Sequence, residues 1–289
     1  MSEIGGVTDS ITKTDFYSAY HESVTDVTRF WTTAMQTEIA RHNAGWQIGR
    51  IDFVEYLRKS DLRYWVAFNM LQKSGPFRSI CDVGGFWGAY PLTLRRLGLE
   101  VSMTEALNYY SESFNPLFNY LIKEGVAVID TDPFEDDTER IAGKFDVVSA
   151  MAVLEHYPHS QRKFLDFMRS MVEPDGRLYI EVPNIAYWPR RIALLCGKSP
   201  LANIGDVFLS EKPFTGHHRE YTPADLQMLA SIGQFDVVDR IQFNYSFRGP
   251  WIKRFISDPM LTLMSQIPAM RECTAVLLKP QQIDRSDDV

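Results

Sequence analysis

The stretch SICDVGGFWG, residues 79–88, decides the fold of this chain. A short apolar run ends in an acid at Asp82, three glycines follow within five residues, and a helical pattern then covers residues 89–97. This order predicts a strand, a tight turn and a helix. Glycines let the backbone approach a ligand, and a helix start presents unpaired N–H groups and a positive dipole end. The segment would therefore suit a small anionic or carboxylate-bearing ligand, and an ordinary glycine-rich connection in an α/β sheet is the alternative left open.

The composition is that of a soluble globular protein. The chain has 289 residues, 45% apolar and 23% charged, enough for one large α/β domain with additions or for two modest domains. Thirty basic and thirty-seven acidic residues give a net charge of −7, which argues against bulk electrostatic binding of nucleic acid. Three distant cysteines (Cys81, Cys196 and Cys273) lack metal-ligand spacing, and neither a signal peptide nor a membrane-spanning apolar run is apparent. We therefore expect a cytoplasmic protein.

The remaining pattern predicts a doubly wound, mostly parallel seven-stranded sheet. Residues 1–75 carry two or three helical patterns, which we interpret as an N-terminal helical extension, and residues 76–280 alternate β-rich and helical runs. The last two strands follow one another without a crossover helix and so predict an antiparallel hairpin. We expect lid insertions near residues 185–220 and 246–270, a turn at 173–176 and a disordered polar tail at 281–289. The predicted strands are 79–83, 100–104, 126–129, 145–150, 177–182, 235–245 and 274–279.

The insertion at 246–270 mixes large apolar residues with Lys253 and Arg254. Such a segment could lie on a membrane surface or cover an active site. An amphipathic helix packed against its own domain is the plainer interpretation, and all three stay open at this point.

Acids follow the first three predicted strands in order. Asp82 ends the first strand, Glu105 the second, and Asp130 and Asp132 the third. The carboxyl ends of strands in an open parallel sheet border one crevice, where ligands bind, and an acid after the second strand suits two ribose hydroxyls. Any one of these acids alone could be a solvated loop residue.

With these residues in hand, the chain resembles the class I S-adenosylmethionine-dependent methyltransferases over residues 77–279. DVGGFWG (82–88) is similar to their first motif, Glu105 to their ribose-binding acid, and GVAVIDTD (125–132) to the segment whose last acid meets the adenine amino group. FDVV (145–148) with AVLEH (152–156) resembles the fourth-strand motif. The resemblance implies S-adenosylmethionine as cofactor, S-adenosylhomocysteine as product, and Asp132 rather than Asp130 at the adenine. The implied cofactor contacts are Asp82, Gly84, Gly85, Phe86, Gly88, Glu105, Asp132 and Met151.

The sequence departs from the family pattern at two places. Phe86 stands beside Trp87 where many relatives have a glycine, so its side chain must turn away from the cofactor or reshape the site. Residues 154–156 resemble a motif of the ubiquinone-pathway O-methyltransferases, in which a preceding Glu helps to bind a divalent metal. Ala152 occupies that place here, and we therefore expect no metal.

Methyl transfer from a sulfonium is an in-line displacement, so catalysis needs positioning and removal of a proton from the acceptor. Histidine suits that proton transfer at neutral pH. His156 follows the fourth strand and is the first candidate base, although it could equally cap its loop. The loop 214–222 supplies His217 and His218 as further candidates, with Arg219 and Tyr221 for acceptor binding. Arg219 could instead pair with Glu220 or a neighbouring acid.

The leading hypothesis is a methyltransferase that acts on a small-molecule or sugar-type acceptor, with oxygen as the favoured atom. A catalytically inactive cofactor-binding scaffold of the same fold, docked to a membrane or a partner through residues 246–270, is the second. A nicotinamide oxidoreductase is the third, and the absence of a G-x-G-x-x-G pattern counts against it.

Overall fold

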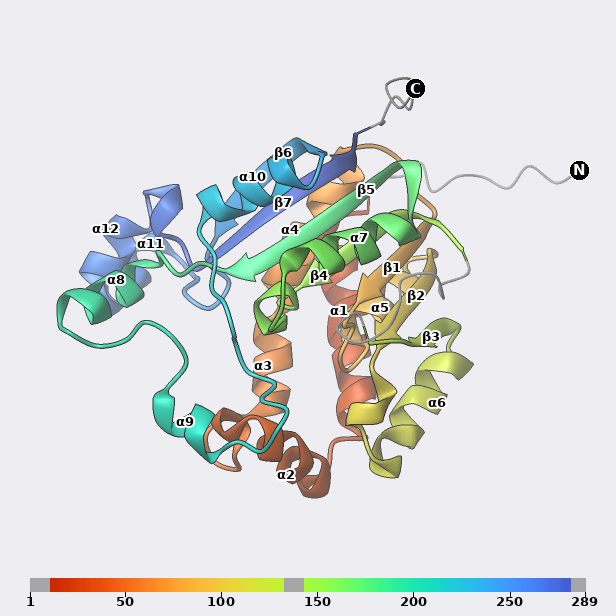
Figure 1. The fold of residues 1–289 in the computed structure, drawn as a ribbon, viewed down its shortest axis with the longest axis horizontal. Coiled ribbons are helices and arrows are strands. Elements are labelled where there is room, and N and C mark those ends of the chain that lie inside the picture. Colours follow the sequence, from red (N-terminus) through yellow and green to blue (C-terminus); the bar gives the residue numbers. More distant parts are fainter. Residues whose placement is uncertain (1–10, 133–142, 282–289) are drawn as a thin grey trace, which may run out of the picture.

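The computed structural model describes residues 11–132 and 143–281, and a seven-stranded sheet runs through it (Figure 1). The strand order is β3-β2-β1-β4-β5-β7-β6, which confirms the predicted fold. The strands are β1 (Ser79–Val83), β2 (Glu100–Glu105), β3 (Val126–Asp130), β4 (Phe145–Met151), β5 (Val172–Pro183), β6 (Phe235–Phe243) and β7 (Cys273–Pro280).

The direction of the strands places the ligand crevice. The β1–β2, β2–β3, β1–β4 and β4–β5 pairs are parallel, whereas β7 runs antiparallel to both β5 and β6. The chain proceeds from β1 outward to β3 and then returns to β4 on the other side of β1. The carboxyl ends of β1 and β4 thus border the topological switch point, where open α/β sheets bind ligands.

Between residues 11 and 75 the structure contains four α-helices, so the prediction of two or three was wrong. They are α1 (Lys13–Thr28), α2 (Thr33–His42), α3 (Phe53–Lys59) and α4 (Asp61–Lys73). The apolar pattern of residues 54–70 is interrupted at Ser60, which ends α3 and begins α4. The Asp52 side chain caps the start of α3, because its Oδ1 accepts from the Glu55 N–H at 2.9 Å.

The sheet is covered by helices on both faces. Side chains of α1, α3, α4, α5 (Ala89–Arg96) and α6 (Asn115–Lys123) belong to one apolar core, whereas those of α7 (Gln161–Met171) and α10 (Pro223–Ile232) belong to a second. Thr222 and Asp225 form a reciprocal capping box that fixes the start of α10.

Residues 173–176, predicted as a turn, fall within the bounds of β5 but are looped out of its pairing with β4. The register shifts from Phe145 opposite Val172 to Val147 opposite Arg177, so these four residues face the single residue Asp146. A Cβ at Gly176 would lie 3.0 Å from the Glu173 carbonyl oxygen, so the chain folds back on itself here as in a turn.

Two helical insertions lie at the carboxyl end of the sheet, near the predicted ranges. The first carries α8 (Trp188–Leu195) and α9 (Ile204–Leu209), and the second carries α11 (Trp251–Ser257) and α12 (Pro259–Met264). In Figure 1 α8 lies beside α11 and α12, with α9 near α2. The Ala44 N–H donates to Ser210 Oγ at 2.9 Å and so ties the first insertion to the N-terminal helices.

Short 3-10 helices complete the fold at Ala44–Trp46, Leu107–Tyr109, Glu112–Phe114, Leu154–His156 and Pro268–Met270. Within residues 11–132 and 143–281, no helix combines the length and the apolar character needed to cross a bilayer. The tail predicted to be disordered falls, from residue 282 onward, outside the described residues.

Candidate functional site

The glycine turn after β1 is packed too closely for larger residues. Gly84 has a φ of +64°, and a Cβ there would lie 2.9 Å from Val153 Cγ2. Gly88 has a φ of +70°, and a Cβ there would lie 2.4 Å from Leu121 Cδ1. Because side chains rarely adopt this backbone conformation and have no room here, glycine is required at both positions.

Phe86 adopts the backbone conformation of the glycine that it replaces. Its φ is 50°, which is uncommon for a bulky residue. Its ring makes edge contacts with Phe53 and Trp87, with centroids 5.6 and 6.1 Å away, and so joins the aromatic cluster of the N-terminal helices. Its N–H donates to Glu105 Oε1. The side chain thus packs among the aromatic residues, and the backbone still serves the turn.

Two carboxyl groups are buried beside this turn. Asp82 and Glu105 are 4% and 8% exposed, and burial raises the pKa of each to about 7. Ser149 Oγ donates to Asp82 Oδ1 at 2.6 Å, and the Tyr110 hydroxyl donates to Glu105 Oε2 at 2.9 Å. These hydrogen bonds oppose the pKa increase, because they favour the ionised form.

The acids after β3 differ in environment. Asp130 is exposed, and its Oδ1 accepts from the Leu107 N–H at 3.0 Å, whereas Asp132 is only 5% exposed. Thr131, between them, donates its N–H to the Glu105 carbonyl at 3.0 Å and holds this segment against β2. Met151, at the end of β4, is 9% exposed. The structure therefore places these residues at the carboxyl ends of β1 to β4, and their contacts with a cofactor stay predictions.

A pair of histidines lies at the end of β4. The rings of His156 and His217 are perpendicular, with centroids 4.8 Å apart. His156 Nδ1 lies 2.8 Å from the Thr215 carbonyl oxygen, and His217 Nδ1 lies 2.7 Å from Glu220 Oε1. Burial, followed by the nearby His217, lowers the pKa of His156 to about 4, so this imidazole is neutral at pH 7.

The carboxylate behind His217 is ionised. Burial alone would raise the pKa of Glu220, but hydrogen bonds from His217 and Arg190 and the charge of Arg190 outweigh it, and the pKa is lowered. An ionised Glu220 orients the His217 ring with its Nδ1–H toward the carboxylate, which turns Nε2 toward Glu155.

The other residues predicted from the same loop do not join this pair. His218 is exposed, and its Nε2 lies 3.0 Å from the Phe214 carbonyl oxygen. Arg219 is exposed and lies 3.8 Å from Asp225 Oδ1, the alternative role considered from the sequence. Tyr221 is fully buried in the second apolar core. Their roles in catalysis and acceptor binding stay predictions.

A cavity of about 230 Å³ opens beside the histidine pair. Its polar wall includes Arg63 from α4, whose Nε lies 2.9 Å from Glu181 Oε2 in a fully buried ion pair. The guanidinium also lies 4.6 Å from the ring centre of Tyr245. The cavity is lined by Arg63, Pro183, Tyr187, Arg190, His217, Tyr245, Glu272 and Cys273.

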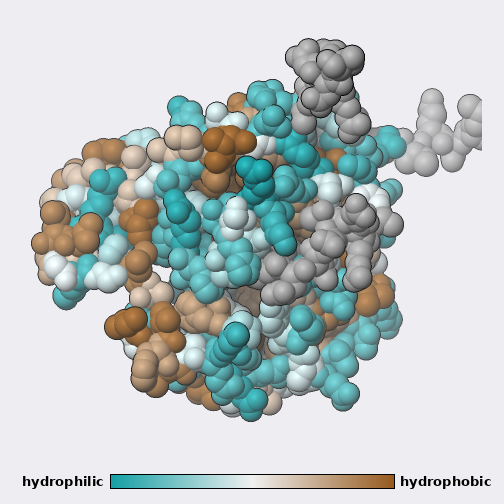
Figure 2. Space-filling model, in the orientation of Figure 1, coloured by the Kyte–Doolittle hydropathy of each residue, from teal (hydrophilic) through white to brown (hydrophobic). Residues whose placement is uncertain are grey.

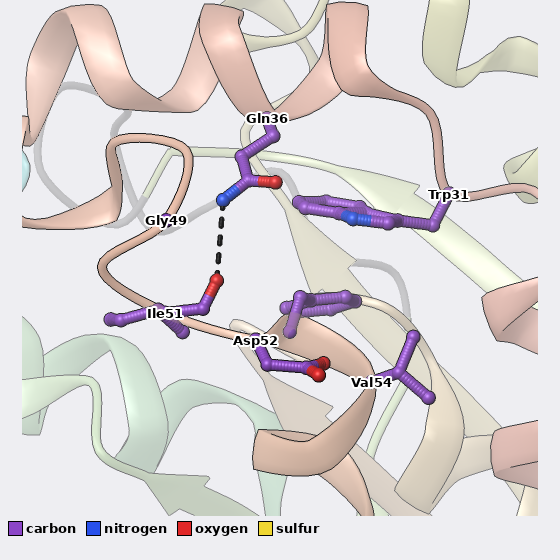
Figure 3. A pocket seen from close by; sticks show the side chains of 7 residues that line it. Trp31, Gln36, Gly49, Ile51, Asp52 and Val54 are labelled. Atoms are coloured by element: carbon purple, nitrogen blue, oxygen red, sulfur yellow. Dashed lines mark hydrogen bonds between the residues drawn. The ribbon is translucent and has the colours of Figure 1, made fainter.

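A larger cavity, of about 360 Å³, lies among the N-terminal helices (Figure 3). Gln36 Nε2 donates to the Ile51 carbonyl across it at 3.3 Å, and Trp31 forms one wall. Asp52 is the one ionisable residue among its seven lining residues, and it already caps α3. We therefore assign the chemistry to the smaller cavity.

A sequence profile of the methyltransferase domain family matches residues 53–239, which is 187 of the 289 residues. The chain belongs to this methyltransferase family. The resemblance to class I S-adenosylmethionine-dependent methyltransferases is thereby confirmed. A comparison with curated proteins found no match.

Solved structures share the fold of this methyltransferase at low sequence identity. The magnesium protoporphyrin IX methyltransferase from Synechocystis PCC 6803, solved with bound SAH, has a TM-score of 0.51 at 14% identity, covering 90% of this chain and 100% of its own. A S-adenosylmethionine-dependent methyltransferase from Clostridium acetobutylicum has a TM-score of 0.51 at 11% identity, covering 76% of this chain and 92% of its own. At this identity the similarity shows the fold alone.

Sequence reasoning missed the buried ion pair of this methyltransferase. Arg63 and Glu181 are 118 positions apart, and neither belongs to a local motif. The available signal was an arginine inside the apolar helical pattern of residues 62–70, since a charge on a buried helix face needs a partner.

Proposed function

We propose that this chain is an enzyme that transfers a methyl group from S-adenosylmethionine to an oxygen atom of a small-molecule or sugar-type acceptor. One observation carries the proposal: the buried acids Asp82, Glu105 and Asp132 lie at the carboxyl ends of β1, β2 and β3, and the cavity lined by His217 lies next to His156, which follows β4 at the same end of the sheet. A cofactor site and an acceptor site in this relation are what in-line transfer requires.

The residues present fit the cofactor. The turn is partly exposed at Gly84 and Gly85, where its backbone could approach the methionine part, whereas Gly88 is buried against Leu121 and serves the packing of the turn. Glu105 is suited to the ribose hydroxyls, which would replace the Tyr110 hydroxyl at Oε2. Asp132 would meet the adenine amino group. When bound, the cofactor supplies a methyl group already activated on a sulfonium, and the chain's task is to hold and orient it.

The acceptor cavity favours a polar ring. Tyr187 and Tyr245 offer aromatic faces and hydroxyl groups, and Arg190 is held by Glu220 at its edge. Holding the acceptor oxygen in line can contribute about 7–11 kcal/mol of the barrier. His217 lines the acceptor cavity and its ring packs against His156, and histidines at this place support oxygen as the methyl-accepting atom, because a hydroxyl acceptor must lose a proton.

Labelled methyl transfer tests this proposal. The protein would be incubated with methyl-labelled S-adenosylmethionine and a fractionated cell extract, and the labelled product identified by mass spectrometry. We expect transfer to a small hydroxylated compound, strongly reduced in His217→Ala and unchanged in His159→Ala, which removes an exposed histidine outside the candidate site. Label on nitrogen or on a macromolecule would contradict the acceptor assignment. Cofactor binding without transfer would favour the scaffold alternative.

A specific observation supports membrane contact as a second role. Large apolar side chains are exposed on both insertions, with Leu195 at 80%, Phe208 at 85% and Ile256 at 77%. Figure 2 shows this apolar colour gathered over α8, α11, α12 and α9. Lys253 lies among these side chains and would favour anionic lipid headgroups. We propose that this apolar surface rests on a membrane, with the acceptor cavity beside it.

We also propose a cytoplasmic location, which the three free cysteines support. The net charge of −7 supports an acceptor other than nucleic acid.

A further inference from the structure

Glu155 is a carboxylate without a local partner. Its side chain is fully buried in the 3-10 helix Leu154–His156, directly after β4. Within the described residues, neither of its oxygens accepts a hydrogen bond from another residue. The nearest cationic candidate is His217, whose Nε2 lies 3.9 Å from Glu155 Oε1. Burial, followed by the nearby Glu181, raises the pKa of Glu155 well above its usual range, so a cation bound here would displace the carboxyl proton.

Two imidazoles lie close to this carboxyl group, and each is held at its Nδ1. Nδ1 of His156 is at the Thr215 carbonyl, and Nδ1 of His217 is at the Glu220 carboxylate. The Nε2 of His217 is thereby turned toward Glu155. A histidine that binds a metal is usually oriented in this way, by a carbonyl or a carboxylate on its second nitrogen.

The backbone fixes these groups in one place. The N–H groups of His218 and Arg219 donate to the Glu155 carbonyl at 2.8 and 3.2 Å. The loop that carries His217 is therefore fastened to the 3-10 helix that carries Glu155 and His156. One ligand atom from each of these three side chains lies within 4.8 Å of the other two.

We propose that Glu155, His156 and His217 form a site for a divalent transition-metal ion. Two imidazoles and one carboxylate suit Zn²⁺, Fe²⁺ or Mn²⁺, whereas Mg²⁺ and Ca²⁺ prefer oxygen ligands. Ligand atoms that lie about 2.1 Å from a tetrahedral zinc ion are ~3.4 Å apart. Side-chain rotations that bring the widest pair, now within 4.8 Å, about 1.4 Å closer would complete the site.

The expectation of no metal rested on Ala152, which stands where a related motif has a glutamate. The third ligand of the proposed site comes from another element, because His217 lies in the loop before α10. His217 also lines the acceptor cavity. With three protein ligands, the metal keeps open positions toward that cavity, as catalytic sites do.

The role of the metal rests on the proposed function. An acceptor hydroxyl bound to it would have a lowered pKa and would release its proton to water. The alkoxide oxygen would then form the bond to the methyl carbon, while the carbon–sulfur bond breaks and its electron pair stays on sulfur. Both imidazoles would serve as ligands in this route instead of accepting the proton.

Metal titration of the chelator-treated full chain tests the site. Calorimetry with Zn²⁺ and visible absorption with Co²⁺ would be measured on wild type, on Glu155→Gln and on His217→Ala. His218→Ala is the matched control, since it removes the neighbouring histidine that faces away. We expect one tight Zn²⁺ site in wild type and control, weakened more than ~100-fold in the other two variants. Glu220→Gln should weaken binding about 10- to 100-fold, as loss of an outer partner does.

Thermal unfolding with and without Zn²⁺ is the second measurement. The metal should raise the midpoint of wild type and His218→Ala but not of His217→Ala, and this difference can be read even in a destabilised variant. Absence of stoichiometric Zn²⁺ binding, or equal affinity in Glu155→Gln, would overturn the inference. If the wild type binds S-adenosylmethionine but no metal, the metal site alone is refuted. If the wild type binds the metal but not S-adenosylmethionine, only the proposed function is refuted.

Discussion

At position 86 a glycine variant should be more stable than an alanine variant, which is the reverse of the usual order. Both variants lose the ring contacts with Phe53 and Trp87, which for a half-buried ring amounts to about 2 kcal/mol. Alanine keeps the strain of a φ near 50°, which costs about 1–2 kcal/mol, whereas glycine relieves it. Glycine in turn gives the unfolded chain about 0.4–1 kcal/mol of extra entropy. We therefore expect Phe86→Gly to be more stable than Phe86→Ala by about 0.5–1 kcal/mol.

Urea unfolding followed by tryptophan fluorescence measures the difference. The control is Phe68, which lies in the middle of α4 with helical geometry. There Phe68→Gly should be less stable than Phe68→Ala by about 1 kcal/mol, since glycine is unfavourable inside helices. If Phe86→Ala proved as stable as Phe86→Gly, the left-handed backbone at this turn, and with it the account of how the site accepts a phenylalanine, would be wrong.

Three further predictions concern the cofactor, the core and the surface. Because burial raises the pKa of Glu105 to about 7 and ribose hydroxyls donate to the ionised form, S-adenosylmethionine affinity should rise between about pH 6 and pH 8, by at most ~10-fold per pH unit. Calorimetry of Glu105→Gln should show a weaker and flatter dependence, and an unchanged profile would exclude this role. Arg63→Met should lower the free energy of unfolding, measured in urea, by about 3–5 kcal/mol, because it leaves Glu181 buried and unpaired. Adding Glu181→Leu should recover part of that loss, and no recovery would show that the two residues are not coupled. Wild type should float with anionic liposomes, whereas a Leu195→Ser/Ile256→Ser variant should float less, and wild type remaining at the bottom would count against membrane contact.

The fold could be predicted because its signals are local. The strand at Ser79–Val83 is bounded by an acid and glycines, and the capping box at Thr222 marks the start of α10. Local signals also mark residues 173–176, which loop out of the pairing between β4 and β5, although they do not reveal that β5 begins before this loop. Local reasoning failed at Ser60, where a continuous apolar pattern hides the break between α3 and α4.

The candidate site was only partly accessible from the sequence. The order of Asp82, Glu105 and Asp132 follows from strand topology, so the acids could be placed in one crevice. The meeting of His217 with Glu155 could not, because it depends on how a loop about sixty residues later folds back onto β4. The direction of the Phe86 ring likewise depends on aromatic residues from separate helices.

Calorimetric titration with S-adenosylmethionine tests whether the chain binds the cofactor on which its proposed function depends. It would be run on wild type and on Glu105→Ala, with S-adenosylhomocysteine and NAD as comparison ligands. The account predicts that wild type binds both sulfur-containing ligands but not NAD, and that Glu105→Ala binds both more weakly. Heat from NAD alone, or no heat from either sulfur-containing ligand, would contradict it.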